Sequence, residues 1–323
     1  MDALHVLAMG KPIWMWAIFM GVVLVLLALD LGIFHRKTRE ISVIESLLLS
    51  GFYITIGLSF GAWVWINLGA VSGKEYLTGF LVEKTLSMDN IFVISLVFSY
   101  FGIPRLYQHR VLFWGILGVL VLRGIVIGLG AVLVASFGWV LYIFALLLIA
   151  TGIKMLVMSD HLPDIDKNPA LKLMRRLMRI TPELHGERFF VRLPDQNASI
   201  VVTWVTPLFV AMILIEIVDL IFALDSVPAI FAITTDPFIV YTSNIFAILG
   251  LRALYFALAA VIERFAYLKP ALALVLVFIG SKIFVADLAG WEKFPAAVSL
   301  GVTLALILGG VAYSLWRTQR QHA

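Results

Sequence analysis

Runs of about twenty or more apolar residues follow one another along the chain, and short polar or Gly/Pro-containing turns separate them. Because a helix needs about 20 apolar residues to cross a bilayer, these runs predict nine transmembrane helices. Their expected limits are 12–34, 41–68, 77–101, 110–135, 138–158, 205–227, 238–262, 270–289 and 294–316. We therefore expect an all-α polytopic membrane protein that forms a single membrane domain over residues 1–323.

The composition agrees with this pattern and narrows the chemistry. Hydrophobic residues make up 62% of the chain and charged residues 14%, whereas a soluble domain carries about 25% charged residues. The chain contains no cysteine, which excludes disulfides, cysteine zinc sites, iron–sulfur clusters and thiol nucleophiles. The net charge of +4 gives no reason to expect a nucleic-acid partner, because in a membrane protein the distribution of Lys and Arg sets orientation instead.

The distribution of basic residues between the connections is strongly uneven. Sixteen Lys and Arg residues fall in one set of alternating connections and only three, Lys11, Lys74 and Lys293, fall in the other. Cytoplasmic loops carry the excess of positive charge. We therefore expect the N-terminus outside and the C-terminus in the cytoplasm, with the first apolar run retained as a helix.

A hydrophilic loop over residues 159–199 separates the fifth and sixth predicted helices, on the cytoplasmic side. Its segment 169–180, PALKLMRRLMRI, places Leu171, Met174, Leu177 and Met178 at helical spacing among basic residues. Such a helix is typical of an in-plane anchor that binds anionic lipids. Docking of a regulatory partner on this helix is the alternative interpretation.

Charged residues inside the third predicted helix recur in the sixth. The segment 83–93, EKTLSMDNIFV, resembles 219–229, DLIFALDSVPA, with the same interval of six residues between acids. The matched pairs are Glu83 with Asp219, Asp89 with Asp225, Asn90 with Ser226, Arg123 with Arg252, and Lys154 with Lys282. We infer two repeats, 77–158 and 200–289, which comprise helices 3–5 and 6–8. Because each repeat has three helices, the second enters the membrane from the opposite side, as in many secondary transporters.

These side chains are costly inside a membrane, since a charge at the bilayer centre costs about 2.5–3.5 kcal/mol on insertion scales. We predict a transport site where helices 3 and 6 meet, made of Glu83, Asp89, Asn90, Glu216, Asp219, Asp225 and Ser226. We assign charge pairing or gating to Asp30, Lys84, Arg123, Lys154, Arg252 and Lys282. The simpler interpretation is that all of these groups form salt bridges that hold the helices together.

The available ligands indicate the class of ion. Carboxylate, amide and hydroxyl oxygens suit Mg²⁺, Ca²⁺ or Mn²⁺. Pro228 and Pro207 remove the backbone partners of the Leu224 and Thr203 carbonyls, which adds candidate ligands. The thioether of Met88, beside Asp89, would favour a transition ion. Carboxylates that release a cation can take up protons, so we expect a proton-linked antiporter.

Three segments carry a family resemblance: EKTLSMDNIFV, EIVDLIFALDSVPAIFAITTDPF and TSNIFAILGLRALYF. They resemble the TerC family of integral membrane proteins, in particular its manganese-exporting bacterial branch, over residues 77–287. The resemblance implies an inner-membrane exporter of Mn²⁺ with inverted three-helix repeats. The resemblance also implies that the family's motif acids correspond to Glu83, Asp89, Asp219 and Asp225 of this chain.

Other functions remain open at this point. A Ca²⁺ or Mg²⁺ transporter would use the same oxygen ligands. An intramembrane aspartyl hydrolase could use Asp89 and Asp225 as a dyad, although the surplus of acids and the repeat disfavour it. A scaffold or sensor could dock a partner on the basic loop. We expect no enzymatic activity and no prosthetic group, with Mn²⁺ only as the transported ion.

Overall fold

A computed structural model describes residues 6–32, 42–157, 165, 168–195, 198–258, 268–291 and 293–321. Eleven helices dominate the described residues: α1 Ile13–Gly32, α2 Val43–Leu68, α3 Ala70–Tyr100, α4 Arg105–Ser136, α5 Val140–Val157, α6 Pro169–Leu177, α7 Pro207–Phe231, α8 Pro237–Leu249, α9 Leu251–Leu258, α10 Leu268–Leu288 and α11 Ala296–Gln321. Two antiparallel strand pairs complete the described fold, β1 Leu7–Ala8 with β2 Lys11–Pro12, and β3 Phe190–Asp195 with β4 Ala198–Val205.

Six of the described helices are long and apolar enough to cross a membrane, namely α2, α4, α5, α7, α10 and α11. The helices α1 and α8 are shorter apolar helices. Helix α3 has 31 residues, but charged residues interrupt its apolar run. The chain is thus an all-α polytopic membrane protein, as the apolar pattern predicts.

The limits of several helices differ from the prediction. Helix α3 begins at Ala70, and its Glu75 is buried, so the polar residues that suggested a start at 77 lie inside the helix. The predicted helix 238–262 is divided at Gly250 into α8 and α9, and residues 259–262 lie outside the described part. Pro207 occupies the first turn of α7, where no backbone N–H is needed. Thr203 pairs with Arg192 in the β3–β4 hairpin, so its predicted role as a freed helical carbonyl is wrong.

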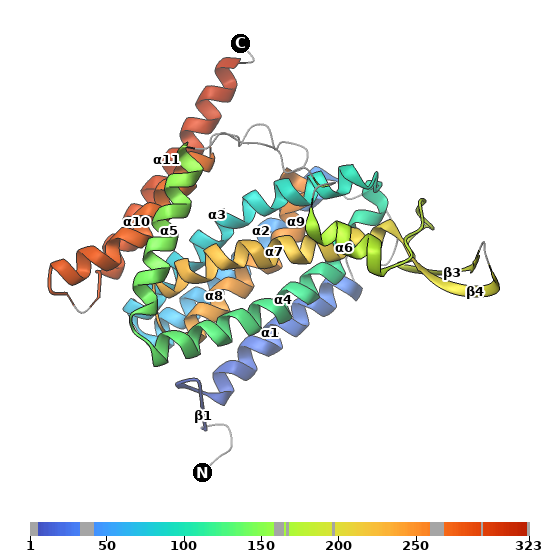
Figure 1. Ribbon diagram of the computed structural model, residues 1–323. Helices are drawn as coiled ribbons and strands as arrows, with labels where there is room; N and C mark the ends of the chain where they lie inside the picture. Colours follow the sequence, from blue (N-terminus) through green and yellow to red (C-terminus); the bar gives the residue numbers. More distant parts are fainter. Residues whose placement is uncertain are drawn as a thin grey trace.

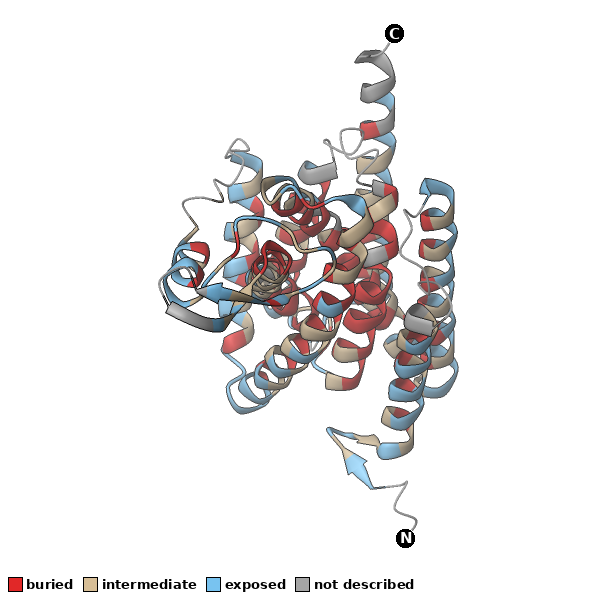
Figure 2. Ribbon diagram, turned by 90° about the vertical axis from the view of Figure 1, so that its right-hand side faces the viewer, coloured by how far each residue is buried: buried red, intermediate tan, exposed pale blue. Residues whose placement is uncertain are grey.

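The helices pack around α3 and α7, which lie side by side in the middle of the molecule (Figure 1). Helix α3 also packs against α2 and α8, α4 packs against α7, and α5 packs against α10. Buried residues gather in these central helices, whereas the outer helices are exposed on their outward sides (Figure 2). Glu83 and Lys84 of α3 and Asp219 of α7 are buried among these helices.

The contact between α5 and α10 is reciprocal. A Cβ atom on Gly152 would lie 2.7 Å from the Ala273 carbonyl oxygen and 2.7 Å from Val277 Cγ2. A Cβ atom on Gly280 would lie 2.6 Å from the Ala145 carbonyl oxygen and 2.8 Å from Ile149 Cγ1. The spacing is the same in both helices. Ala145 and Ile149 lie seven and three residues before Gly152, and Ala273 and Val277 lie seven and three residues before Gly280. The absence of a side chain at both glycines lets the two backbones approach closely.

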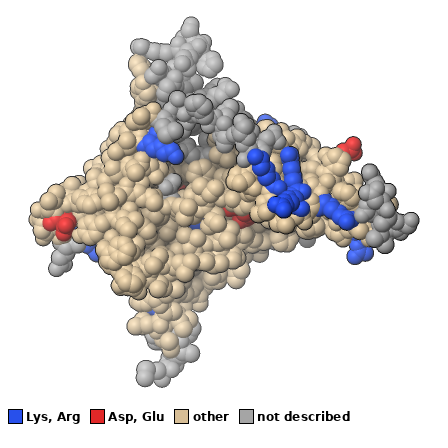
Figure 3. All heavy atoms as spheres, viewed as in Figure 1, with Lys and Arg blue, Asp and Glu red and all other residues tan. Residues whose placement is uncertain are grey.

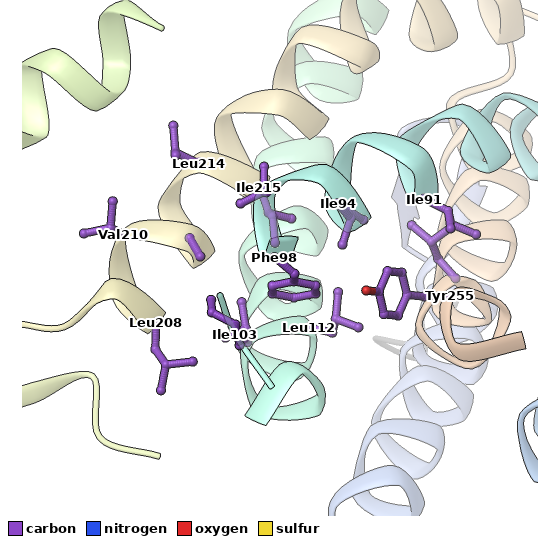
Figure 4. Packing of buried hydrophobic residues seen from close by; sticks show 14 of the residues in the cluster. Ile91, Ile94, Phe98, Ile103, Leu112, Leu208, Val210, Leu214, Ile215 and Tyr255 are labelled. Atoms are coloured by element: carbon purple, nitrogen blue, oxygen red, sulfur yellow. The ribbon is translucent and has the colours of Figure 1, made fainter. Parts of the chain in front are cut away.

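A large apolar cluster closes one end of the helix bundle. Its residues come from α3, α4, α7 and α9, and include Ile91, Phe98, Leu112, Ile215 and Tyr255 (Figure 4). The side chains of α6 also join this cluster. The cluster fixes the ends of α3 and α7 relative to α6 and the β3–β4 hairpin, which projects from this end of the molecule (Figure 1).

The predicted amphipathic helix exists as α6, but its apolar side faces the protein. Leu171 and Met174 are buried in the cluster at 1% and 6% exposure, whereas Leu177 is 70% exposed. Basic side chains gather over this region of the surface (Figure 3). The apolar stripe therefore docks α6 onto its own bundle. The β3–β4 hairpin was not predicted from the sequence, because its residues were assigned to the loop 159–199 and to the start of the predicted helix 205–227.

Candidate functional site

The centre of the molecule contains an ion-pair network built around Arg123. Helix α4 carries Arg123, whose side chain is 1% exposed, between α3, α7 and α8. Arg123 Nη1 lies 2.7 Å from Glu83 Oε1, and Nη2 lies 3.1 Å from Asp219 Oδ1. Both acids are also buried, with Glu83 at 1% exposure. The predicted equivalent pair of acids from α3 and α7 thus binds one shared guanidinium.

Further hydrogen bonds complete the environment of Arg123. Its Nε donates to Asp219 Oδ2 at 3.2 Å, and its Nη1 donates to Ser226 Oγ at 2.9 Å and to Asn244 Oδ1 at 3.2 Å. Asn244 Nδ2 in turn donates to Glu83 Oε2 at 2.9 Å. A buried charge is stable only when it is paired and hydrogen-bonded, and this network meets both conditions.

A small cavity adjoins the network between α3, α4, α7 and α9. Its volume is about 30 Å³, which is enough for a water molecule or a small ion. Asn90 and Asp219 supply polar groups to its wall, and Tyr255 lies at its edge. Asn90 Nδ2 donates to Asp219 Oδ1 at 3.1 Å, while Asn90 Oδ1 is buried and has no hydrogen-bond partner among the described groups. The Asn90 Oδ1 acceptor is therefore available to a cation or to a hydrogen-bond donor.

Glu216 has a different environment from the other acids. Its two carboxylate oxygens are buried, and neither has a hydrogen-bond partner within the described part of the chain. The carboxylate lies against α4, where a Cβ atom on Gly118 would be 2.5 Å from Oε1. Gly118 therefore provides the space that the carboxylate occupies. A buried carboxylate without a partner is costly, which makes Glu216 a candidate for cation binding.

Lys84 is buried at the break between α8 and α9. Its Nζ donates to the Ala247 carbonyl oxygen at 3.1 Å, in the last turn of α8, where a cation is favoured by the helix dipole. A Cβ atom on Gly250 would lie 2.8 Å from this Nζ. Helix α3 runs from Ala70 to Tyr100, so Lys84 lies near its centre.

The remaining predicted residues fall into two groups. Lys282 is buried and donates from Nζ to Ser299 Oγ at 3.0 Å, whereas Lys154 is exposed. The side chains of Asp30, Met88, Asp89, Asp225 and Arg252 lie outside the described part of the structure. Asn244 was not predicted, although an asparagine inside the apolar run TSNIFAIL was a signal that could have identified it.

The described side chains do not form a complete metal site. Among them, no three His, Asp or Glu groups converge closely enough to hold a metal ion. Glu83 and Asp219 are engaged by Arg123 instead. Acidic atoms are visible in the middle of the face shown in Figure 3, so an acid group reaches the surface of the bundle at this level.

Fold and site together define a polytopic membrane protein with a buried, charged centre assembled from α3, α4, α7 and α8. The model of the family described as "Integral membrane protein TerC family" matches residues 68–322. The chain belongs to the TerC family, which confirms the resemblance seen in the sequence.

Several related proteins match over nearly their whole length. An uncharacterized membrane protein of Rickettsia bellii is 50% identical over 302 residues, which cover 94% of this chain and 97% of the relative. An uncharacterized membrane protein of Myxococcus xanthus is 45% identical over 312 residues, with coverage of 97% and 95%. A protein of Escherichia coli K12 named "Putative membrane-bound redox modulator Alx" is 42% identical over 320 residues, with coverage of 96% and 97%. No solved structure gives a significant match.

Proposed function

We propose that this protein is a secondary transporter that exports divalent metal ions, with Mn²⁺ as the first candidate, in exchange for protons. The observation that carries the proposal is the set of buried acceptor oxygens without described partners, on Asn90 and Glu216. Asn90 lines the small cavity together with Asp219, and the Glu216 carboxylate lies against Gly118 of α4. Oxygens of this kind are the preferred ligands of hard divalent cations.

The arrangement of helices supports inverted repeats around this junction. If α3, α4 and α5 correspond to α7, α8–α9 and α10, then the contact of α3 with α8 has its counterpart in the contact of α7 with α4. The reciprocal packing of Gly152 and Gly280 follows the same correspondence. Secondary transporters with inverted repeats bind substrate at the repeat interface and alternate access by rocking one repeat against the other. Nine membrane-crossing helices, with α8 and α9 counted together, fit this proposal.

The preference for Mn²⁺ rests on the family resemblance and on the Met88 thioether beside Asp89. Carboxylate and amide oxygens alone serve Ca²⁺ or Mg²⁺ equally well, so these ions define the alternative substrate. The side chains of Asp89 and Asp225 complete the proposed ligand set together with Asn90 and Ser226.

The membrane orientation is part of the same proposal. The excess of Lys and Arg on one set of connections supports an inner-membrane protein with its N-terminus outside and its C-terminus in the cytoplasm. The exposed basic side of α6 then faces the anionic leaflet, and we propose that segment 169–180 binds anionic lipids there.

Two other functions have weaker support. The relative named as a redox modulator raises the question of redox chemistry, but this chain has no cysteine and therefore no thiol or disulfide couple of its own. A proteolytic dyad of Asp89 and Asp225 would require two acids that share a proton, and the surplus of acids in the predicted spans disfavours it. We propose no enzymatic activity.

The proposal is tested by transport of radiolabelled Mn²⁺ into inverted membrane vesicles. We expect uptake by the wild type that depends on the pH gradient, and a loss of at least about tenfold in Glu216→Gln and Asp225→Asn. Glu187→Gln, which removes an acid from the surface ion pair with Arg110, is the matched control and should transport normally. If Ca²⁺ or Mg²⁺ competed as well as Mn²⁺, the assignment of Mn²⁺ as substrate would be refuted. If the Mn²⁺ flux did not depend on the pH gradient, the proposed coupling to protons would be refuted.

A further inference from the structure

Arg123 occupies the oxygens that a divalent cation would need. Its guanidinium contacts Glu83 Oε1, both oxygens of Asp219, Ser226 Oγ and Asn244 Oδ1. All of these atoms are carboxylate, hydroxyl or amide oxygens, which are the ligand types of Mn²⁺, Ca²⁺ and Mg²⁺. The guanidinium and a transported ion therefore have the same binding partners.

The charges make simultaneous occupancy unfavourable. Glu83 and Asp219 together carry two negative charges, which one divalent cation would neutralise. The guanidinium would repel the ion, and both would compete for the same oxygens in a region where Arg123 and Glu83 are each only 1% exposed. Repulsion between like charges is strong in a desolvated site. Binding of the ion to these acids thus requires that Arg123 release them.

We propose that Arg123 is a tethered competitor of the transported cation, which holds Glu83 and Asp219 when the site is empty and releases them when the ion binds. The proposal rests on the function proposed above and adds the device that releases the ion. Return of the guanidinium to the two acids displaces the cation, so that tight binding does not prevent turnover.

The first test is binding of Mn²⁺ to the purified full-length protein by titration calorimetry. Close charge pairs across interfaces couple by at least about 1.5 kcal/mol, equivalent to about tenfold in affinity. We therefore expect Arg123→Ala to bind Mn²⁺ at least about tenfold more tightly than the wild type. Lys282→Met removes a buried cation that contacts Ser299 instead of these acids, and it should give no such gain.

Chemical rescue distinguishes competition from a purely structural role. Guanidinium chloride at low millimolar concentration should weaken Mn²⁺ binding to Arg123→Ala competitively and leave the wild type unchanged. In transport assays, KM and kcat of Arg123→Ala should both fall, because the ion binds more tightly and leaves more slowly.

The outcomes separate this inference from the proposed function. A wild type that neither binds nor transports any divalent cation overturns both. A wild type that binds Mn²⁺, with a folded Arg123→Ala that binds it equally or more weakly, overturns the inference alone. If Arg123→Ala does not fold, Arg123→Lys decides, because lysine keeps the charge but lacks the planar fork of five donors. It should bind Mn²⁺ several-fold more tightly than the wild type, and an unchanged or weaker affinity rejects the role of competitor.

Discussion

Alanine substitution of Gly152 or Gly280 tests the close contact between α5 and α10. A new Cβ on either glycine would lie 2.6–2.7 Å from a backbone carbonyl oxygen of the other helix. Ordinary contacts between carbon and carbonyl oxygen measure about 3.3–3.6 Å. A backbone oxygen cannot rotate away as a flexible side chain can, so the helices must separate by roughly 0.6–1 Å.

The cost of this separation can be estimated from two opposing effects. Overpacking of a well-packed contact costs about 1–3 kcal/mol, whereas alanine in place of a helical glycine gains about 0.5–1 kcal/mol. We expect each single variant to lose about 1–2 kcal/mol of stability. The double variant should lose less than the sum, because one separation of α5 and α10 relieves both clashes and neighbouring sites are not additive.

Unfolding of the detergent-solubilised protein, followed by circular dichroism, measures these changes. Gly128→Ala on α4 is the control, since no atom lies within 4 Å of its added Cβ, and it should be neutral or slightly stabilising. Equal losses for Gly152→Ala and Gly280→Ala would also support the correspondence of the two repeats. If both variants were as stable as Gly128→Ala, the close approach of the helices would be refuted.

Three further substitutions, one of them with a matched control, test individual side-chain contacts. Gly118→Ala should leave thermal stability nearly unchanged but reduce Mn²⁺ flux at least about tenfold. The reason is that the added methyl group displaces the flexible carboxylate of Glu216. Normal Mn²⁺ flux in this variant would contradict a role for that carboxylate in transport. Leu171→Ala should cost about 2–5 kcal/mol of local stability and speed proteolysis of the loop that contains α6. Leu177 is exposed, so Leu177→Ala should cost at most about 0.5 kcal/mol. Equal proteolysis rates for the two variants would show that α6 does not pack on the bundle. Asp219→Asn should lower unfolding stability by about 3–5 kcal/mol, since it removes one partner of a buried ion pair, and an unchanged melting temperature would reject that pairing.

The sequence was sufficient to predict the helices and part of the site. Long apolar runs predict helices whatever the neighbours are, because each run must be shielded from water. The repeat also placed Glu83 and Asp219 in equivalent positions, and the structure brings both acids to Arg123. That convergence depends on spacing within the chain, which the sequence displays directly.

Other features depend on contacts between distant segments and could not be predicted. The direction of the apolar stripe on α6 depends on whether the bundle or the lipid is nearer, and Leu171 and Met174 turn out to face the bundle. Glu75 was assigned to the connection before residue 77 because it is charged, yet it is buried within α3. The partners of Arg123 could not be predicted either, because the sequence offers several acids as partners for each intramembrane base.

Two glycines each make room for a charged side chain. Gly118 gives space to Glu216 of α7, and Gly250 gives space to Lys84 of α3, so in each case the side chain belongs to the first helix of the other proposed repeat. The charges are opposite, and their partners differ: Lys84 donates to the Ala247 carbonyl, whereas Glu216 has no partner among the described groups. The Lys84 ammonium repels cations on the α3–α8 side. We therefore expect a mobile cation to reach the centre on the α4–α7 side, where the Glu216 carboxylate lies and Asp219 lines the cavity.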